Sequence, residues 1–258
     1  MRYLVSVLVI ACIAVVMFAP VAARQDDDAA CRAAYAQWRA AVEAHPQLGD
    51  PFWFDSHNQG PADLRKAVDN VVSYGPNLVP TLVEELRSEG DHMRVYRLLG
   101  LLRRVAGIDL NFDLKATTGQ AHYWEAVPAL KSRFLSKWDA GDYANATVIL
   151  GAGWKDPGVG TDGSVSPENL GPLLQYGVFA VPFIADKLTR HESPVLFAAF
   201  LNVTDHMDEY TRFYKHPGNS FATGQEKAAF MKQWAHDNVH KFSRLKGLQD
   251  QIAALAAK

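Results

Sequence analysis

Three Val-Pro pairs constrain the fold of this chain more than any other feature of its sequence. The pairs are Val79-Pro80, Val127-Pro128 and Val181-Pro182, and consecutive prolines lie roughly 50 residues apart, the unit length of a helical-hairpin repeat. Apolar residues follow at the second and sixth positions after each proline, so one apolar helical stripe occurs three times. Proline suits the first turn of a helix because its missing N–H would be unpaired there in any case. Each pair therefore predicts the start of an amphipathic helix.

The same helical period runs through most of the remaining chain. Apolar residues recur every three or four positions in segments 28–45, 61–74, 93–105 and 225–258, and no segment alternates apolar and polar residues as a half-buried strand would. Gly75 can adopt a positive φ angle and end the helix that precedes the first Val-Pro pair. The sequence therefore predicts an all-α protein.

Two phrases of the chain return about 100 residues later, a spacing that suggests an internal repeat. Residues 74–80 read Tyr-Gly-Pro-Asn-Leu-Val-Pro, and residues 176–182 read Tyr-Gly-Val-Phe-Ala-Val-Pro. Residues 134–138 (Phe-Leu-Ser-Lys-Trp) are similar to residues 230–234 (Phe-Met-Lys-Gln-Trp). Tandem duplication is the simplest explanation, and chance similarity among Ala- and Leu-rich helices is the alternative.

The Gly-then-Val-Pro phrase, with its leucines at helical spacing, resembles HEAT and armadillo-type α-solenoids, including the short HEAT-like repeats of bacterial proteins. The resemblance covers about residues 61–242. Units here are longer and less regular than those of the family, with inserted loops at 108–123 and 206–224, which favours a compact bundle of two related halves over a long superhelix. The resemblance implies α-α helical hairpin repeats that present a binding or scaffolding surface, usually to another protein, and only in a minority of cases an enzyme.

We expect five segments along the chain. A signal peptide at 1–23 precedes an N-terminal helix and aromatic loop at 24–60, a first HEAT-like half at 61–150, a Gly-rich linker at 151–165, and a second HEAT-like half with the C-terminal helix at 166–258. Without the signal, roughly 235 residues remain, enough to bury one substantial core.

The N-terminal segment has the features of an export signal. Met1-Arg2 gives a positive start, Tyr3 to Phe18 is almost uninterruptedly apolar, and small residues lead to a cleavage site after Ala23, as in secretory signals. We therefore expect a periplasmic or secreted protein. An uncleaved membrane anchor is one alternative, and lipidation at Cys12 is another.

Removal of the signal leaves Cys31 as the sole cysteine, so no intramolecular disulfide can form and the core must hold the fold. The formal net charge of −2 is close to balance and predicts neither nucleic acid nor an anionic membrane surface as a partner. Any membrane contact would come from an uncleaved signal segment.

Three motifs place histidines where they could do chemistry. His236 and His240 lie one helical turn apart, a spacing that could hold one metal ion, while Asp205-His206 and Asp55-Ser56-His57 put carboxylates beside imidazoles, as acid–base catalysis requires. Capping and solvated helix faces are the better explanation of all three. The sequence therefore predicts no catalytic residue, no metal site and no cofactor. The alternative is a hydrolase or cell-wall-active enzyme that uses Asp205, His206 or the His236/His240 pair in a groove between the halves.

Aromatic residues in or beside loops are the remaining candidates for binding. Aromatic side chains next to polar residues suit a protein interface and also stack on sugar rings, although they could instead fill the ends and concave side of the bundle. The candidate binding residues are Phe52, Trp53, Phe54, Tyr123, Trp124 and Trp154. We expect an exported, non-catalytic binding or scaffold module whose partner is another protein.

Overall fold

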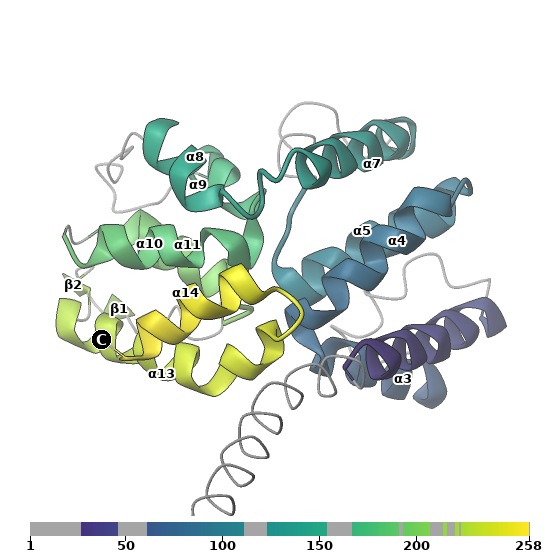
Figure 1. Cartoon of the computed structure of the whole chain (residues 1–258), viewed down its shortest axis with the longest axis horizontal. Coiled ribbons are helices and arrows are strands. Elements are labelled where there is room, and N and C mark those ends of the chain that lie inside the picture. The colour runs from purple at the N-terminus through teal and green to yellow at the C-terminus, as the bar shows by residue number, and fades with distance from the viewer. Residues whose placement is uncertain are drawn as a thin grey trace, which may run out of the picture.

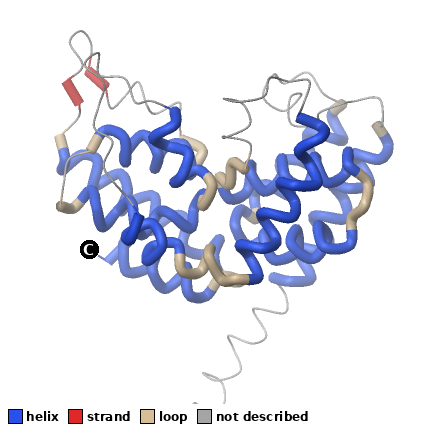
Figure 2. The backbone as a smooth tube through the Cα atoms, turned by 90° about the horizontal axis from the view of Figure 1, so that it is seen from above, coloured by secondary structure: helices blue, strands red, loops and turns tan. Residues whose placement is uncertain are grey.

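The computed structural model describes residues 27–45, 61–110, 123–153, 167–190, 193–206, 214–215, 220–221 and 223–257. Helices make up nearly all of these residues, as Figures 1 and 2 show, so the all-α prediction is confirmed. The exception is a hairpin in which strand β1 (Tyr214–Lys215) pairs antiparallel with β2 (Ser220–Phe221). The expected signal peptide, residues 1–23, lies outside the described residues. None of the described helices combines the length and apolar character needed to cross a bilayer.

The helices form two lobes that lie side by side (Figures 1 and 2). The N-terminal lobe consists of a helix at 27–44, α3 (Ala62–Ser73), the 3-10 turn η1 (Gly75–Leu78), α4 (Val79–Ser88), α5 (His92–Ala106) and α7 (Tyr123–Asp139). The C-terminal lobe consists of α8 (Ala146–Gly153), α9 (Pro167–Leu174), the 3-10 turn η3 (Gly177–Ala180), α10 (Val181–Leu188), α11 (Pro194–Val203), α13 (Gly224–Asn238), the 3-10 turn η5 (Val239–Phe242) and α14 (Lys246–Ala257).

Helix α8 crosses the expected boundary between the halves. It packs against η3 and α10 of the C-terminal lobe, and it continues to Gly153, three residues into the segment expected to be a linker. Leu150 and Ala146 are buried, and burial of these side chains outweighs the helix-weakening effect of Gly151 and Gly153.

Two of the three Val-Pro pairs start helices as expected. α4 begins at Val79 and α10 at Val181, each with the proline in its first turn. A four-residue 3-10 turn precedes each helix and begins with a glycine in the left-handed region, Gly75 at φ 52° and Gly177 at φ 54°. The prediction that Gly75 adopts a positive φ is therefore confirmed.

The prediction for the third pair is wrong. Helix α7 begins at Tyr123, so Pro128 lies inside it rather than in its first turn. Proline removes one internal hydrogen bond there and strains the preceding turn. Val127, Leu130 and Phe134 are each at most 3% exposed, and their burial holds the helix together across the proline.

The backbones of the two lobes touch beside η3. A Cβ atom on Gly177 would lie 2.1 Å from the carbonyl oxygen of Ala106, and one on Gly107 would lie 2.3 Å from that of Val203. The backbone N–H of Asp109 also donates to the carbonyl of Leu174 at 2.9 Å. Only glycine permits such close approach, so these contacts set the spacing of the lobes.

A hydrogen-bond network centred on Arg244, the Arg244 clasp, joins the first described helix to the C-terminal lobe. The Arg244 side chain, 10% exposed, donates from Nη1 to the Asn77 carbonyl at 2.9 Å and to Thr81 Oγ1 at 2.8 Å, and from Nη2 to Asp28. Its backbone N–H donates to Asn77 Oδ1 at 3.0 Å. Nearby, the Ser243 hydroxyl donates to Asp27 at 2.5 Å. Residues from the beginning and the end of the described chain therefore share one hydrogen-bond network.

Candidate functional site

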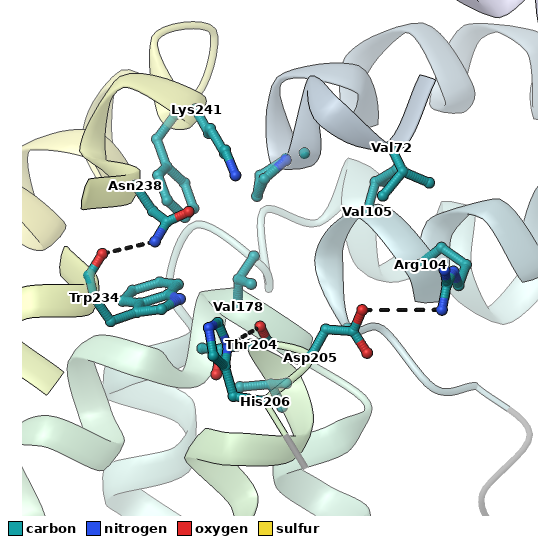
Figure 3. A pocket seen from close by; sticks show the side chains of 15 residues that line it. Val72, Arg104, Val105, Val178, Thr204, Asp205, His206, Trp234, Asn238 and Lys241 are labelled. Atoms are coloured by element: carbon teal, nitrogen blue, oxygen red, sulfur yellow. Dashed lines mark hydrogen bonds and ion pairs between the residues drawn. The ribbon is translucent and has the colours of Figure 1, made fainter. Parts of the chain in front are cut away.

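An open cavity of about 220 Å³ lies where the two lobes meet (Figure 3). The end of α3, the η1 turn and the end of α5 form one wall. The end of α11, together with α13 and η5, forms the other, and η3 contributes Val178. The lining residues are Val72, Gly75, Pro76, Arg104, Val105, Gly107, Val178, Val203, Thr204, Asp205, His206, Trp234, Asn238, Lys241 and Phe242.

Asp205 enters the cavity wall from a helix end with an unusual backbone. It follows α11 in the left-handed region at φ 59° and is the only residue other than glycine with a positive φ among those described. The His206 N–H donates to the Leu201 carbonyl at 2.7 Å, and the Asp205 N–H donates to that of Asn202 at 3.3 Å. This pair of bonds is the Schellman motif, in which glycine is the usual left-handed residue.

The Asp205 carboxylate faces the opposite wall (Figure 3). Its Oδ2 lies 3.9 Å from Nη1 of Arg104, which comes from the last turn of α5. The Asp205 side chain is 74% exposed, so the ion pair spans the cavity mouth at the limit of direct contact and contributes little to stability.

The imidazole of His206 is held by its own chain. Nδ1 lies 2.6 Å from the Thr204 carbonyl oxygen, and because a carbonyl only accepts, Nδ1 carries the proton. The neutral ring then has its lone pair on Nε2. The ring also meets Phe230 edge to face, with centroids 5.7 Å apart. These contacts fix the orientation of His206 at the cavity.

The α13–η5 wall supplies a lysine and an amide. Lys241 is half-buried, its methylenes lie over Gly75, where an added Cβ would come within 3.2 Å of Lys241 Cδ, and its Nζ points into the cavity (Figure 3). Asn238 donates from Nδ2 to the Trp234 carbonyl at 2.9 Å, which leaves its Oδ1 on the cavity side (Figure 3). Trp234 itself is 7% exposed and gives this wall an apolar surface.

The hydroxyl, the carboxylate and the imidazole Nδ1 of the lining residues each have another partner. Thr204 carries the only hydroxyl among them, and that hydroxyl donates to the Phe200 carbonyl at 2.7 Å. Asp205 pairs with Arg104 and His206 with a backbone carbonyl, so they do not act as an acid–base dyad with each other. The polar groups left on the cavity side are Nε2 of His206, Oδ1 of Asn238 and Nζ of Lys241.

Of the two histidine motifs that the structure describes, Asp205-His206 lines the cavity and the His236/His240 pair does not. His236 and His240 are both exposed, and α13 ends at Asn238, so the pair spans an α-to-3-10 junction rather than one continuous helix. His236 Nδ1 lies 3.1 Å from Asp237 Oδ1. Across the described ranges, no three His, Cys, Asp or Glu residues gather closely enough to hold a metal ion.

The remaining candidates of the sequence fall on residues or side chains that the structure does not describe. Phe52, Trp53, Phe54, Trp154 and the Asp55-Ser56-His57 motif lie outside the described residues. Tyr123 and Trp124 open helix α7, and their side chains are likewise outside what the structure describes. Sequence reasoning missed Arg104, Asn238 and Lys241. Asn238 and Lys241 flank the junction of α13 and η5 without forming a recognisable binding motif, and Arg104 comes from α5, far away in the sequence.

Comparison with known proteins gives no relative from which a function could be transferred. No protein-family model matches the chain, and neither a curated protein nor a solved structure does.

Proposed function

We propose that this chain is an exported, non-catalytic binding protein built from two related HEAT-like helical halves. The observation that carries the proposal is the cavity between the lobes. Both lobes contribute to its walls, and polar groups of Asp205, Asn238 and Lys241 stand on its surface. The only hydroxyl among its lining residues, that of Thr204, donates to the Phe200 carbonyl. A site of this kind can bind a ligand without transforming it.

The order of elements supports the duplication. In both lobes, a helix is followed by a 3-10 turn with a left-handed glycine, a Val-Pro helix, and a further helix that ends in a left-handed residue. α5 packs against α3 and α4, as α11 packs against α9 and α10. α7 contacts α4, as α13 contacts α10. A chance similarity of sequence would give no reason for matching contacts.

The aromatic phrases support it as well. Phe134 and Trp138 of α7 correspond to Phe230 and Trp234 of α13. Trp138 meets Tyr143 from the turn that follows, with ring centroids 5.9 Å apart, and Trp234 meets Phe242 from its own following turn at 6.2 Å. Equivalent side chains thus make equivalent contacts after both helices, as expected of diverged copies of one unit.

The partner we propose is another protein, as the resemblance to helical-repeat proteins implies. Export through the signal at 1–23 belongs to the same proposal, with a membrane-anchored form as the alternative. N-terminal mass spectrometry of the protein recovered from cells tests the export step. A mature chain that begins at Arg24 is the expected result.

Capture experiments with a blocked cavity test the binding function. Val72 lines the cavity, so Val72→Trp fills it, whereas Val148→Trp places the same side chain on a site that is 72% exposed on α8. We expect the wild-type chain and Val148→Trp to retain the same exported protein, and Val72→Trp to lose it although its melting temperature is unchanged. Equal capture by all three chains contradicts a function in this cavity.

A hydrolase that uses His206 is the second candidate. The Thr204 carbonyl fixes the tautomer that leaves Nε2 as a base, which could accept a proton from a water molecule. A turnover that disappears in His206→Ala, while the fold and the melting temperature persist, would favour the enzyme over the binding protein.

A further inference from the structure

We propose that the cavity binds a small carboxylate whose anionic group pairs with the ammonium of Lys241. The inference rests on the proposed binding function and names the chemistry of its ligand. It follows from the charges on the cavity wall, the size of the cavity and the hydrogen-bonding groups beside Lys241.

The charge balance of the cavity leaves Lys241 as the excess cation. Arg104 and Asp205 offset one another across the mouth, with Nη1 and Oδ2 3.9 Å apart. Lys241 is half-buried, and its Nζ points into the cavity (Figure 3). Among the described residues, no carboxylate or hydrogen-bond acceptor pairs with this ammonium. A partly desolvated cation gains most from a ligand of opposite charge.

The packed methylenes of Lys241 hold its ammonium in place. They cover Gly75, where even a Cβ would come within 3.2 Å of Cδ. Packing of the stem limits the rotamers of the side chain, so less conformational entropy is lost when an anion binds. The position of the charge is therefore set before the ligand arrives.

The neighbouring groups favour a carboxylate with a hydrogen-bond donor close to it. His206 Nε2 and Asn238 Oδ1 are acceptors on the same side of the cavity, and they suit a hydroxyl or amino group rather than further anionic oxygens. Phosphate is typically held by several N–H donors or a bidentate arginine, whereas Arg104 here faces Asp205.

The size of the cavity limits the rest of the ligand. At about 220 Å³, it is smaller than the roughly 300–1,000 Å³ of pockets that enclose drug-sized molecules. Val72, Val105 and Val178 give it apolar surface for a short aliphatic group. A free amino or hydroxy acid meets these requirements, and so does the C-terminal residue of a peptide.

Calorimetric titration of the full chain tests the proposal and separates the two sources. The probes are L-alanine, L-lactate, the tripeptide Ala-Ala-Ala with a free C-terminus, the same tripeptide amidated, and inorganic phosphate. We expect at least one free carboxylate to bind and the amidated peptide not to bind. Binding by the free tripeptide alone identifies a peptide C-terminus, and binding by L-alanine or L-lactate identifies a small acid. Binding of phosphate alone, equal binding of both tripeptides, or no binding at all overturns the proposal.

Variants of Lys241 test whether carboxylate binding depends on its ammonium. Lys241→Met keeps the methylenes over Gly75 and removes the charge, so we expect about a 10- to 100-fold loss of carboxylate affinity, as for a lost hydrogen bond to a charged group. Lys241→Arg should keep most of the affinity, which guards against an effect on folding. Lys246→Met, on the exposed start of α14, is the matched control and should leave affinity unchanged. Unaltered affinity in Lys241→Met refutes the carboxylate site, while the proposed function stands if Val72→Trp still abolishes partner capture.

Discussion

Gly75 and Gly177 share a left-handed backbone but differ in what surrounds them. Their φ angles are 52° and 54°. A Cβ on Gly177 would lie 2.1 Å from the Ala106 carbonyl oxygen, whereas one on Gly75 would meet only the flexible side chain of Lys241 at 3.2 Å. We expect Gly75→Ala to lose about 1–2 kcal/mol of unfolding free energy, the usual penalty for a left-handed L-residue. Gly177→Ala should lose about 3 kcal/mol or more, because overpacking against backbone is added.

Urea denaturation of the two alanine variants measures this difference. The wild-type chain supplies the reference, and each variant is the control for the other, since both bear the same backbone penalty. Equal losses of stability would mean that the lobes shift apart at Gly177 without resistance. The close backbone contact would then not set their spacing.

Asp205 allows the opposite substitution, in which a left-handed residue other than glycine is replaced by glycine. It occupies the left-handed position of a helix end where glycine is preferred, and its ion pair with Arg104 is long and exposed. Asp205→Gly should therefore raise the unfolding free energy by about 0.5–1 kcal/mol. Thermal and urea denaturation check the gain. A loss of stability would show that the carboxylate contributes more to the fold than its 3.9 Å contact with Arg104 suggests.

At the scale of the element, the position of each proline decides its effect. Pro80 and Pro182 lie in the first turns of α4 and α10, where no hydrogen bond is lost. Pro128 lies inside α7, where proline is about 3 kcal/mol less favourable than alanine before packing is considered. Pro128→Ala should therefore stabilise α7 and slow amide hydrogen exchange in its first two turns. Pro80→Ala should leave exchange in α4 unchanged or faster, and the opposite ranking would contradict this account.

Local pattern predicted the elements well because most of them depend on neighbours in sequence. Val79, Val181 and Gly75 were placed correctly, since turn chemistry and helix starts act over a few residues. Pro128 was misplaced because α7 continues on the N-terminal side of the proline to Tyr123, with Val127 buried against the core. Such burial is a tertiary effect, and a Val-Pro pair carries no sign of it.

The cavity was predictable only in part for the same reason. Asp205-His206 stood out as a contiguous acid–base motif and does line the cavity. Lys241 and Arg104 come from η5 and α5, far apart in sequence, and only the packing of the lobes brings them to one cavity. The His236/His240 spacing seemed equally favourable, but the helix ends between the two residues.

At the scale of the whole molecule, the Arg244 clasp connects the two lobes. Its side chain, 10% exposed, binds the Asn77 carbonyl and the Thr81 hydroxyl of the N-terminal lobe. We expect Arg244→Ala to lower the unfolding free energy by about 2–3 kcal/mol, the value for hydrogen bonds to a charged donor. Arg190→Ala is the control, because Arg190 is 65% exposed and pairs only locally, with Asp186 four residues earlier, a contact worth about 0.5 kcal/mol or less. Urea denaturation measures the loss of unfolding free energy in the two variants. Similar losses would show that the Arg244 clasp does not hold the two lobes together.

The acid end of the clasp makes its strength depend on pH. The pKa of Asp28 is lowered below its usual value, chiefly by the hydrogen bond from Arg32; burial opposes this effect, and the positive charge of Arg244 lowers the pKa further. The folded state therefore binds a proton at Asp28 less readily than the unfolded chain does. In the unfolded chain, an aspartate has a pKa of about 3.9. The stabilisation by Asp28 is complete above that pH and is lost as the pH falls through the lower pKa of the folded state. Asp28→Asn should consequently be less stable than the wild type at pH 7, and the difference in unfolding free energy should shrink towards zero as the pH falls through the lowered pKa of Asp28 in the folded state. Urea denaturation of both chains from pH 7 down to strongly acidic pH measures the difference, and a gap that stays constant would mean that the Asp28 charge does not stabilise the fold.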